Sequence, residues 1–393
     1  MKGNRFFVEV DAFLKKKEGQ PVCGDCFVSR KVQNEHRIVA TLSDGLGSGV
    51  KANVLATMTA SMAVNFISRH EPIERTAKAI MRTLPIDSKR MMSYATFTII
   101  DVRHDGETRV VEYGNPKCAV VRNGELFQPH RNEMELDTDK ADKIMYSFEF
   151  KAQKEDRLVF FSDGVSQAGI GTNYNPFGWE EDQVHQYICD VIADNKYISA
   201  GQLAKKIVRQ AVSKDILKPK DDTSCGVIYF REPRKLLICT GPPFHKRDDE
   251  RLAGTINGFD GRKIVCGGTT AQILARELKR EIEVGMMAKG GLPPTSKMDG
   301  VDLITEGILT LGGVASYLEN NANTSVKGEG PAVDIVRMLF DSDEIHFMVG
   351  TKINEAHQDP NLPVELEIRR NVIKKIKRLL EDKFLKEVKL EFI

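Results

Sequence analysis

Short runs of β-forming residues, separated by polar turns that contain glycine, fill much of the first ~230 residues. Within this part, apolar residues recur in steps of three and four over 50–67, which predicts an amphipathic helix, and 203–212 predicts another. Short strands with helices grouped between them predict an α+β fold, in which a β-sandwich is flanked by helices. The strands expected here are 37–42, 96–101, 109–113, 119–122, 158–161 and 226–230.

The pattern changes around residues 231–234. Beyond them, strands, loops and helices alternate, which predicts a smaller α/β domain with some parallel strand pairing. We therefore divide the chain into residues 1–232 and 233–393. In the second part, segments that contain strands are 235–243, 263–270, 300–307, 343–349 and 388–393, and helices are expected at 271–283, 308–318 and 369–384.

Composition changes this picture little. The chain carries 57 Lys and Arg against 56 Asp and Glu, without a run of five or six like charges, so we expect neither nucleic-acid binding nor a polybasic membrane patch. Charges interrupt the apolar stretches, and we expect no membrane span and no signal peptide. Seven cysteines, most of them within apolar runs, favour reduced thiols in a cytoplasmic protein. The thiols expected to be buried are Cys118, Cys189, Cys225, Cys239 and Cys266.

Candidate chemistry lies in aspartates at glycine turns next to predicted strands. Carboxylates at strand ends point into a solvated rim, and several that converge repel one another unless a hard cation lies between them. A metal site with room for water suggests hydrolysis. Each Asp-Gly pair alone is an ordinary turn former, so only the ordered set favours metal binding. The set is Asp25, Asp44 before Gly45, Asp163 before Gly164, and the pair Asp221 and Asp222.

Other motifs are weaker evidence for a function. Cys23 and Cys26 form a lone C-x-x-C pair, and a structural zinc needs two more suitably spaced ligands, so we interpret them as small residues beside Asp25. The glycine loop after Asp44 is not a nucleotide-binding P-loop, because the required Gly-Lys-Ser/Thr ending is absent.

Taken in order, Gly24-Asp25, Asp44-Gly45-Leu46-Gly47-Ser48-Gly49, Ser162-Asp163-Gly164-Val165 and Asp221-Asp222-Thr223-Ser224 resemble the metal-dependent protein serine/threonine phosphatases. The resemblance is to the type 2C superfamily, and more narrowly to its bacterial branch typified by stage II sporulation protein E. Ala95-Thr96-Phe97 and Gly114-Asn115-Pro116 support it. It covers residues 6 to about 230 and implies hydrolysis of phosphoserine or phosphothreonine on a protein.

The resemblance also implies two Mn²⁺ or Mg²⁺ ions. On that basis Asp44 would bridge the ions, the Gly45 carbonyl would ligate one, and Asp25 would support that side. Asp163 and Asp221 would hold the other ion, with Asp222 as the alternative to its neighbour. The arginine that eukaryotic members place near the phosphate is not assignable in this sequence.

Two rival functions stay open: a phosphatase-fold scaffold or signal sensor with weak catalysis, and a hydrolase for small phosphomonoesters. The second domain resembles no family that we can name, and we expect it to bind a regulatory protein or a small ligand. Its turn 266–271 favours a helix cap at Thr269 or Thr270 over an anion site, and Asp302 and Glu306 lie near a strand end. The phosphoprotein substrate, homodimer formation and the choice of Mn²⁺ or Mg²⁺ are left open.

Overall fold

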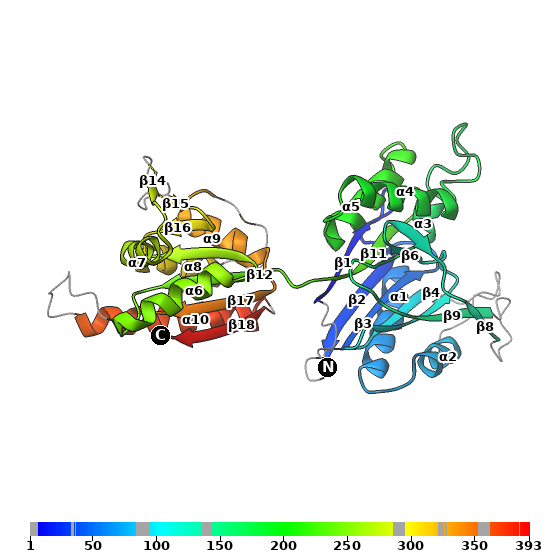
Figure 1. Ribbon diagram of the computed structural model, residues 1–393. Helices are drawn as coiled ribbons and strands as arrows, with labels where there is room; N and C mark the ends of the chain where they lie inside the picture. The colour runs from blue at the N-terminus through cyan, green and yellow to red at the C-terminus, as the bar shows by residue number, and fades with distance from the viewer. Residues whose placement is uncertain are drawn as a thin grey trace. The chain divides into compact units, whose positions relative to one another are not determined.

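The structure is a computed structural model, and the chain divides into two compact units, Met1–Glu232 and Pro233–Ile393 (Figure 1). Each unit is described by itself. The residues described are 7–32, 35, 37–83, 95–135, 144–285, 295–320, 326, 328–352, 362–384 and 386–393.

The first unit contains two antiparallel sheets. In the described chain, one sheet has the order β1 (Phe7–Lys15), β11 (Thr223–Arg231), β10 (Arg157–Phe161), β6 (Ala119–Arg122) and β7 (Glu125–Phe127). The other has the order β2 (Asp25–Val32), β3 (Arg37–Gly45), β4 (Ala95–Val102), β5 (Glu107–Tyr113), β9 (Ile144–Lys151) and β8 (Asn132–Glu135).

Helices cover the outer face of each sheet, so the unit has four layers. The helices are α1 (Gly49–Ile67) and α2 (Ile73–Thr83) on the second sheet, and α3 (Asp163–Ser166), α4 (Glu181–Asp194) and α5 (Ala200–Lys214) on the first. Strand β10 illustrates why a sheet of this unit needs a cover on each face. Leu158 and Phe160 are buried between the sheets, whereas Val159 and Phe161 are buried under the helices. Because successive side chains of a strand point to opposite faces, both faces of β10 must be apolar. The predicted β-sandwich flanked by helices is confirmed.

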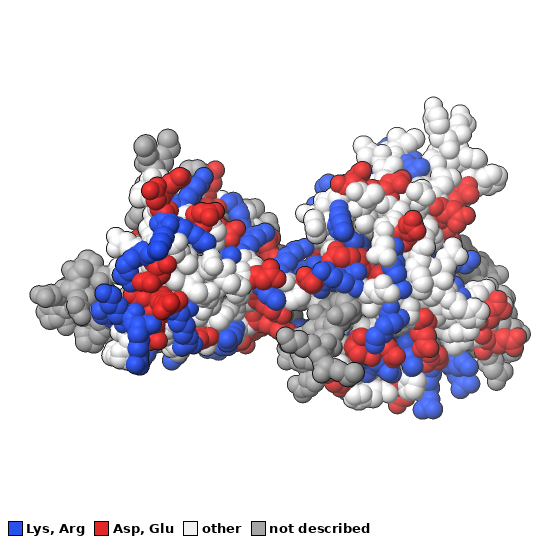
Figure 2. Space-filling model, in the orientation of Figure 1, with Lys and Arg blue, Asp and Glu red and all other residues white. Residues whose placement is uncertain are grey.

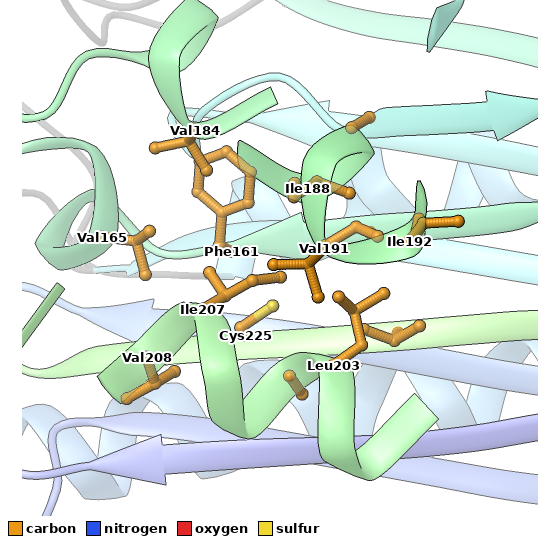
Figure 3. Close-up of a cluster of buried hydrophobic side chains, with 14 of the residues drawn as sticks. Phe161, Val165, Val184, Ile188, Val191, Ile192, Leu203, Ile207, Val208 and Cys225 are labelled. Atoms are coloured by element: carbon orange, nitrogen blue, oxygen red, sulfur yellow. The ribbon is translucent and has the colours of Figure 1, made fainter. Parts of the chain in front are cut away.

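The helical layer on the first sheet forms a continuous apolar core. Figure 3 shows Phe161 of β10 and Cys225 of β11 meeting the apolar side chains of α4 and α5. Those side chains are Val184, Ile188, Val191 and Ile192 from α4, and Leu203, Ile207 and Val208 from α5, each at most 5% exposed. Steps of three and four residues place each set on one side of its helix.

Helix α1 departs from an expectation. By length and composition its 19 residues could span a membrane, although charges were expected to interrupt every long apolar stretch. A core helix of a soluble protein passes the same test, and α1 packs on β2, β3 and β4 with Ala52, Ala56 and Ala60 fully buried. Length and composition therefore do not separate a span from a core helix here.

The second unit has one sheet, in the order β14 (Glu283–Val284), β15 (Ser296–Met298), β16 (Val301–Thr305), β13 (Arg262–Cys266), β12 (Lys235–Thr240), β17 (Glu344–Val349) and β18 (Glu387–Phe392). The pairs from β16 to β18 are parallel, which confirms the predicted α/β domain. A 3-10 turn (Lys246–Asp248), α6 (Asp249–Gly258) and α7 (Gly268–Leu278) precede α8 (Ile308–Asn320), α9 (Pro331–Phe340) and α10 (Leu362–Asp382). Helices α6 and α7 pack on one face, and α8, α9 and α10 on the other.

Some detailed expectations were wrong. Helix α7 ends at Leu278 rather than at residue 283, because Lys279 adopts a left-handed conformation (φ 54°) that stops the helix. Cys189 is only partly buried, whereas Cys118, Cys225, Cys239 and Cys266 are buried, and all seven cysteines are free thiols.

Charges of both signs are mixed across the surface. On the face drawn in Figure 2, Lys and Arg lie among Asp and Glu on each unit. On that face, positive and negative charges are therefore interspersed rather than segregated into patches of one sign.

Candidate metal centre

Asp25 and Asp44 come together because their strands pair. Strands β2 and β3 are antiparallel, with Asp25 directly opposite Asp44, and on the other side of β3 Asp44 lies opposite Thr96 of β4. Side chains of residues directly opposite in an antiparallel pair lie on the same face, with β-carbons about 4.5–5.5 Å apart. Two carboxylates separated by 19 residues in sequence are therefore neighbours at one end of the sheet.

The other sheet supplies the remaining aspartates. Asp163 begins α3 two residues beyond the end of β10, and Asp221 and Asp222 directly precede β11. Strands β10 and β11 pair with Phe161 opposite Cys225, so their ends lie together. Ser162 links these ends, since its hydroxyl accepts the Ser224 N–H at 3.0 Å.

The electrostatics show that the two groups of aspartates converge. Burial, and then the charges of Asp25, Asp163 and Asp221, raises the pKa of Asp44 well above its ordinary value. Asp44 in turn affects the pKa of both Asp25 and Asp163, so the three carboxyl groups interact. Like charges held this close are unfavourable without a counterion.

Several carboxylate oxygens in this cluster lack partners. In the described part of the chain, both oxygens of Asp25, Oδ1 of Asp163 and Oδ2 of Asp222 are buried without a hydrogen bond. Buried oxygens that accept nothing are costly, and hard divalent cations bind such oxygens. The donor set therefore fits Mg²⁺ or Mn²⁺.

The arrangement does not form an all-protein cage. Among the residues that the structure describes, no three His, Cys, Asp or Glu side chains are grouped so as to hold one ion. Mg²⁺ is commonly bound by one or two carboxylates and keeps several waters. The cluster thus fits hydrated ions that lie between carboxylates.

Asp221 and Asp222 have different surroundings. Asp222 is 3% exposed, and its Oδ1 accepts the Lys17 N–H at 3.0 Å. The Asp221 side chain is 43% exposed; its charge raises the pKa of Asp44, and the charge of Asp163 raises the pKa of Asp221. Asp222 therefore braces the loop at Lys17 and acts on Asp25, whereas Asp221 acts on Asp44.

The glycines beside the aspartates are required by close backbone packing. A β-carbon at Gly45 would overlap the carbonyl oxygen of Ala52 in α1, and one at Gly164 would overlap the carbonyl oxygen of Asp222. A β-carbon at Gly24 would lie 2.6 Å from Oδ2 of Asp222. At each of these three glycines, a second segment of the chain packs too closely to leave room for a β-carbon. A role in forming a turn would not by itself require this close packing.

The two supporting motifs meet beside Asp44. Asn115 accepts a hydrogen bond from the Thr96 hydroxyl at 2.5 Å and donates to Thr98 at 3.1 Å. Gly114 has φ 69°, and a β-carbon there would lie 2.5 Å from Cγ2 of Thr96. The Asn115 turn therefore orients Thr96, the residue opposite Asp44.

Sequence reasoning missed three residues around the aspartates. The Lys17 ammonium lies 3.9 Å from Oδ1 of Asp221. Asn53 of α1 donates to the Cys23 carbonyl at 2.8 Å, and Gln167 donates to Oδ2 of Asp163 at 2.9 Å. Nothing in the local sequence distinguishes Lys17 from its neighbours Lys15 and Lys16. Gln167 could have been found, since it lies four residues after Asp163 on a helical spacing.

Comparisons with known proteins define the class. A family model described as stage II sporulation protein E (SpoIIE) matches residues 34–231, which is half of the 393-residue chain. The chain therefore belongs to the stage II sporulation protein E family. Asp25 lies before the matched residues. No curated protein sequence matches the chain.

Solved structures with similarity to the chain are remote. The phosphatase domain of SpoIIE from Bacillus subtilis, with a fragment of its regulatory domain, is 14% identical with a TM-score of 0.48, and the match covers 57% of this chain and 64% of that one. The RsbU and RsbW domains of a Mycobacterium tuberculosis protein are 14% identical (TM-score 0.44; 64% and 67% covered). RsbX in complex with magnesium is 18% identical (TM-score 0.39; 58% and 96% covered). The chain thus spans less than two thirds of the first of these structures.

Proposed function

We propose that the first unit hydrolyses phosphoserine or phosphothreonine on a protein substrate. The observation that carries the proposal is the convergence of Asp25, Asp44, Asp163 and Asp221, with buried carboxylate oxygens that lack partners. Membership of the stage II sporulation protein E family supports the same reaction.

We assign the metal ligands from the types of residue in the cluster. Asp44 and the Gly45 carbonyl would hold one ion, with Asp25 in support, and Asp163 and Asp221 would hold the other. Asp222 stays the alternative to its neighbour: each of the two accepts one backbone N–H, and Oδ2 of Asp222 is buried without a partner among the described residues. Two Mn²⁺ or Mg²⁺ ions would supply an acidified, positioned water for attack on the phosphoester.

Lys17 is our candidate for binding the substrate phosphate. Its loop, residues 15–21, lines a surface hollow of about 390 Å³. The Lys17 backbone is fixed by Asp222 through its N–H, while its ammonium, with a side chain 35% exposed, lies near Asp221. A lysine held this way could bind a phosphate dianion as a point charge. It would take the place of the arginine that we did not find in the sequence.

The test compares three substrates with the full chain and Mn²⁺: a phosphoserine peptide, a phosphoserine protein and p-nitrophenyl phosphate. We expect phosphate release from the peptide or protein, and loss of release when EDTA removes the metal. Release from p-nitrophenyl phosphate alone would favour the small-ester hydrolase. Release from none, with manganese binding detected by calorimetry, would favour a scaffold.

We further propose that the protein acts in the cytoplasm and that residues 233–393 regulate the first unit or recruit its substrate. Fractionation of cells tests the first statement. Comparing the turnover of the full chain and of residues 1–232 on the same phosphoprotein tests the second.

A further inference from the structure

In the parallel sheet of the second unit, two neighbouring strands are followed by connections that run to opposite faces of the sheet. Strands β13 and β16 pair in parallel, with Cys266 opposite Thr305. The chain leaves β13 for α7 on one face of the sheet, and leaves β16 for α8 on the other face. Such divergence at the carboxyl ends of parallel strands is where open α/β sheets bind ligands.

Three glycines lie at this point, so none of these positions adds a side chain to it. The Gly267 N–H bonds to the Thr305 carbonyl at 2.9 Å, and a β-carbon at Gly307 would lie 3.6 Å from the α-carbon of Gly267. The two turns are thus in backbone contact. A β-carbon at Gly268 would meet no described atom within 4 Å.

Two buried hydroxyl groups lie in the first turns of the helices that follow these strands. Thr270 is 1% exposed, and a β-carbon at Gly267 would lie 3.6 Å from its Oγ1. Thr310 is fully buried in the first turn of α8. Neither hydroxyl has a hydrogen-bond partner among the described residues. The helix cap that we expected at Thr269 or Thr270 is wrong: Gly267 is the N-cap of α7, and it has no side-chain cap bond.

A carboxylate completes the set. Glu306 directly follows β16, and its Oε2 is buried without a partner in the part of the chain that the structure describes. Asp302, the other acidic candidate, is already used, because its Oδ2 accepts the Lys263 N–H at 2.7 Å. The site thus offers donors at two helix N-termini and a separate acceptor at Glu306.

We propose that the turns after β13 and β16 bind a sugar phosphate, of the kind that a nucleotide carries. Its phosphate lies at the N-termini of α7 and α8, where backbone N–H groups and the helix dipoles favour an anion and the Thr270 hydroxyl can donate. Its sugar hydroxyls donate to the Glu306 carboxylate. Phosphate without a sugar binds less tightly, because it has no sugar hydroxyl to donate to Glu306 and so nothing offsets the repulsion between the two anions.

The test is calorimetric titration of the full chain, with EDTA present so that the first unit holds no metal. The probes are AMP, ribose 5-phosphate, adenosine and inorganic phosphate. We expect AMP or ribose 5-phosphate to bind at least about tenfold more tightly than either adenosine or inorganic phosphate. Binding of AMP but not ribose 5-phosphate identifies a nucleotide, and equal binding identifies a sugar phosphate.

Variants locate the site. Thr270→Val removes only a hydroxyl without a partner, so the melting temperature should not fall, while affinity should drop about tenfold. Gly268→Ala places a methyl group in the open space and should weaken binding similarly. Glu306→Gln should reduce the preference for the sugar phosphates over inorganic phosphate. Gly312→Ala in α8, which also meets no described atom within 4 Å, is the matched control and should bind normally.

Three results would overturn the proposal. One is no binding of AMP or ribose 5-phosphate at concentrations up to about 5 mM. Another is binding that Thr270→Val and Gly268→Ala leave unchanged. The third is inorganic phosphate that binds as tightly as the sugar phosphates. None of these results bears on phosphoester hydrolysis by the first unit.

Discussion

In the first unit, the ionisation of single aspartates depends on the groups around them. Asp44 interacts with Asp25, Asp163 and Asp221. Burial is the largest cause that raises the pKa of Asp44, and the charges of these three aspartates raise it further. In the metal-free protein such a cluster destabilises the fold, because the carboxylates repel one another. Substitutions at these positions should therefore separate function from stability.

We expect Asp44→Asn to abolish phosphate release and to leave the melting temperature in EDTA unchanged or raised. The amide keeps the shape of the side chain and removes one of the repelling charges. Phosphopeptide turnover and thermal unfolding measure the two effects. Asp260→Asn, at an exposed position in the second unit, is the control. Turnover like that of the unchanged protein would show that the ligand assignment is wrong.

Lys17 allows a second test at this scale. Lys17→Gln should lower kcat/KM for a phosphopeptide by about tenfold, mainly through KM, because a phosphate contact worth roughly 1.4 kcal/mol is lost. Lys17→Arg should keep most of the activity, and Lys16→Gln is the matched control one residue away. Equal effects of Lys16→Gln and Lys17→Gln would mean that general charge, rather than Lys17, attracts the substrate.

Among the elements, the contact between α1 and the end of β3 closely constrains the centre. Gly45 ends β3, and Ala52 of α1 presses on it through its carbonyl oxygen. The helix position and the geometry of Asp44 are thus coupled by backbone contact.

Gly45→Ala should consequently displace α1 or the end of β3. We expect a loss of unfolding free energy of about 1–3 kcal/mol and weaker manganese binding. Chemical denaturation and calorimetry measure these two quantities. Gly254→Ala in α6, where a β-carbon meets no described atom within 4 Å, should be neutral or slightly stabilising. Unchanged metal affinity in Gly45→Ala would separate the helix contact from the centre.

At the scale of the whole molecule, each apolar core lies within one unit. The clusters between and outside the two sheets contain residues of the first unit, and the clusters on both faces of the parallel sheet contain residues of the second. Cores that share no residues can unfold separately.

We therefore expect residues 1–232 to fold and to release phosphate from a phosphopeptide without the second unit. Scanning calorimetry should show one transition for this fragment and two for the full chain. An unfolded fragment, examined by circular dichroism, would contradict the independence of the two cores.

Much of the architecture was predictable from the sequence because it depends on local patterns. The spacing of apolar residues predicted α1 and α5, and the change of pattern near Pro233 predicted a second, α/β part. Helices α4, α6 and α9 were missed, although Val184, Ile188 and Val191 in α4 follow the same steps. These helices lie next to segments rich in turn residues, where periodicity competes with loop composition.

For the candidate site, the sequence by itself determined which residue types could hold a hard cation: aspartates next to glycines, in an order that indicates a family. Only the tertiary structure decided which of them meet, because strand register places Asp25 opposite Asp44 and the second sheet brings in Asp163 and Asp221. It also placed Lys17 beside Asp221, brought Ala52 of α1 against Gly45, and left the buried Thr270 hydroxyl without a partner among the described residues. Contacts between segments far apart in sequence have no local signature, so these roles depend on how the sheets and helices pack.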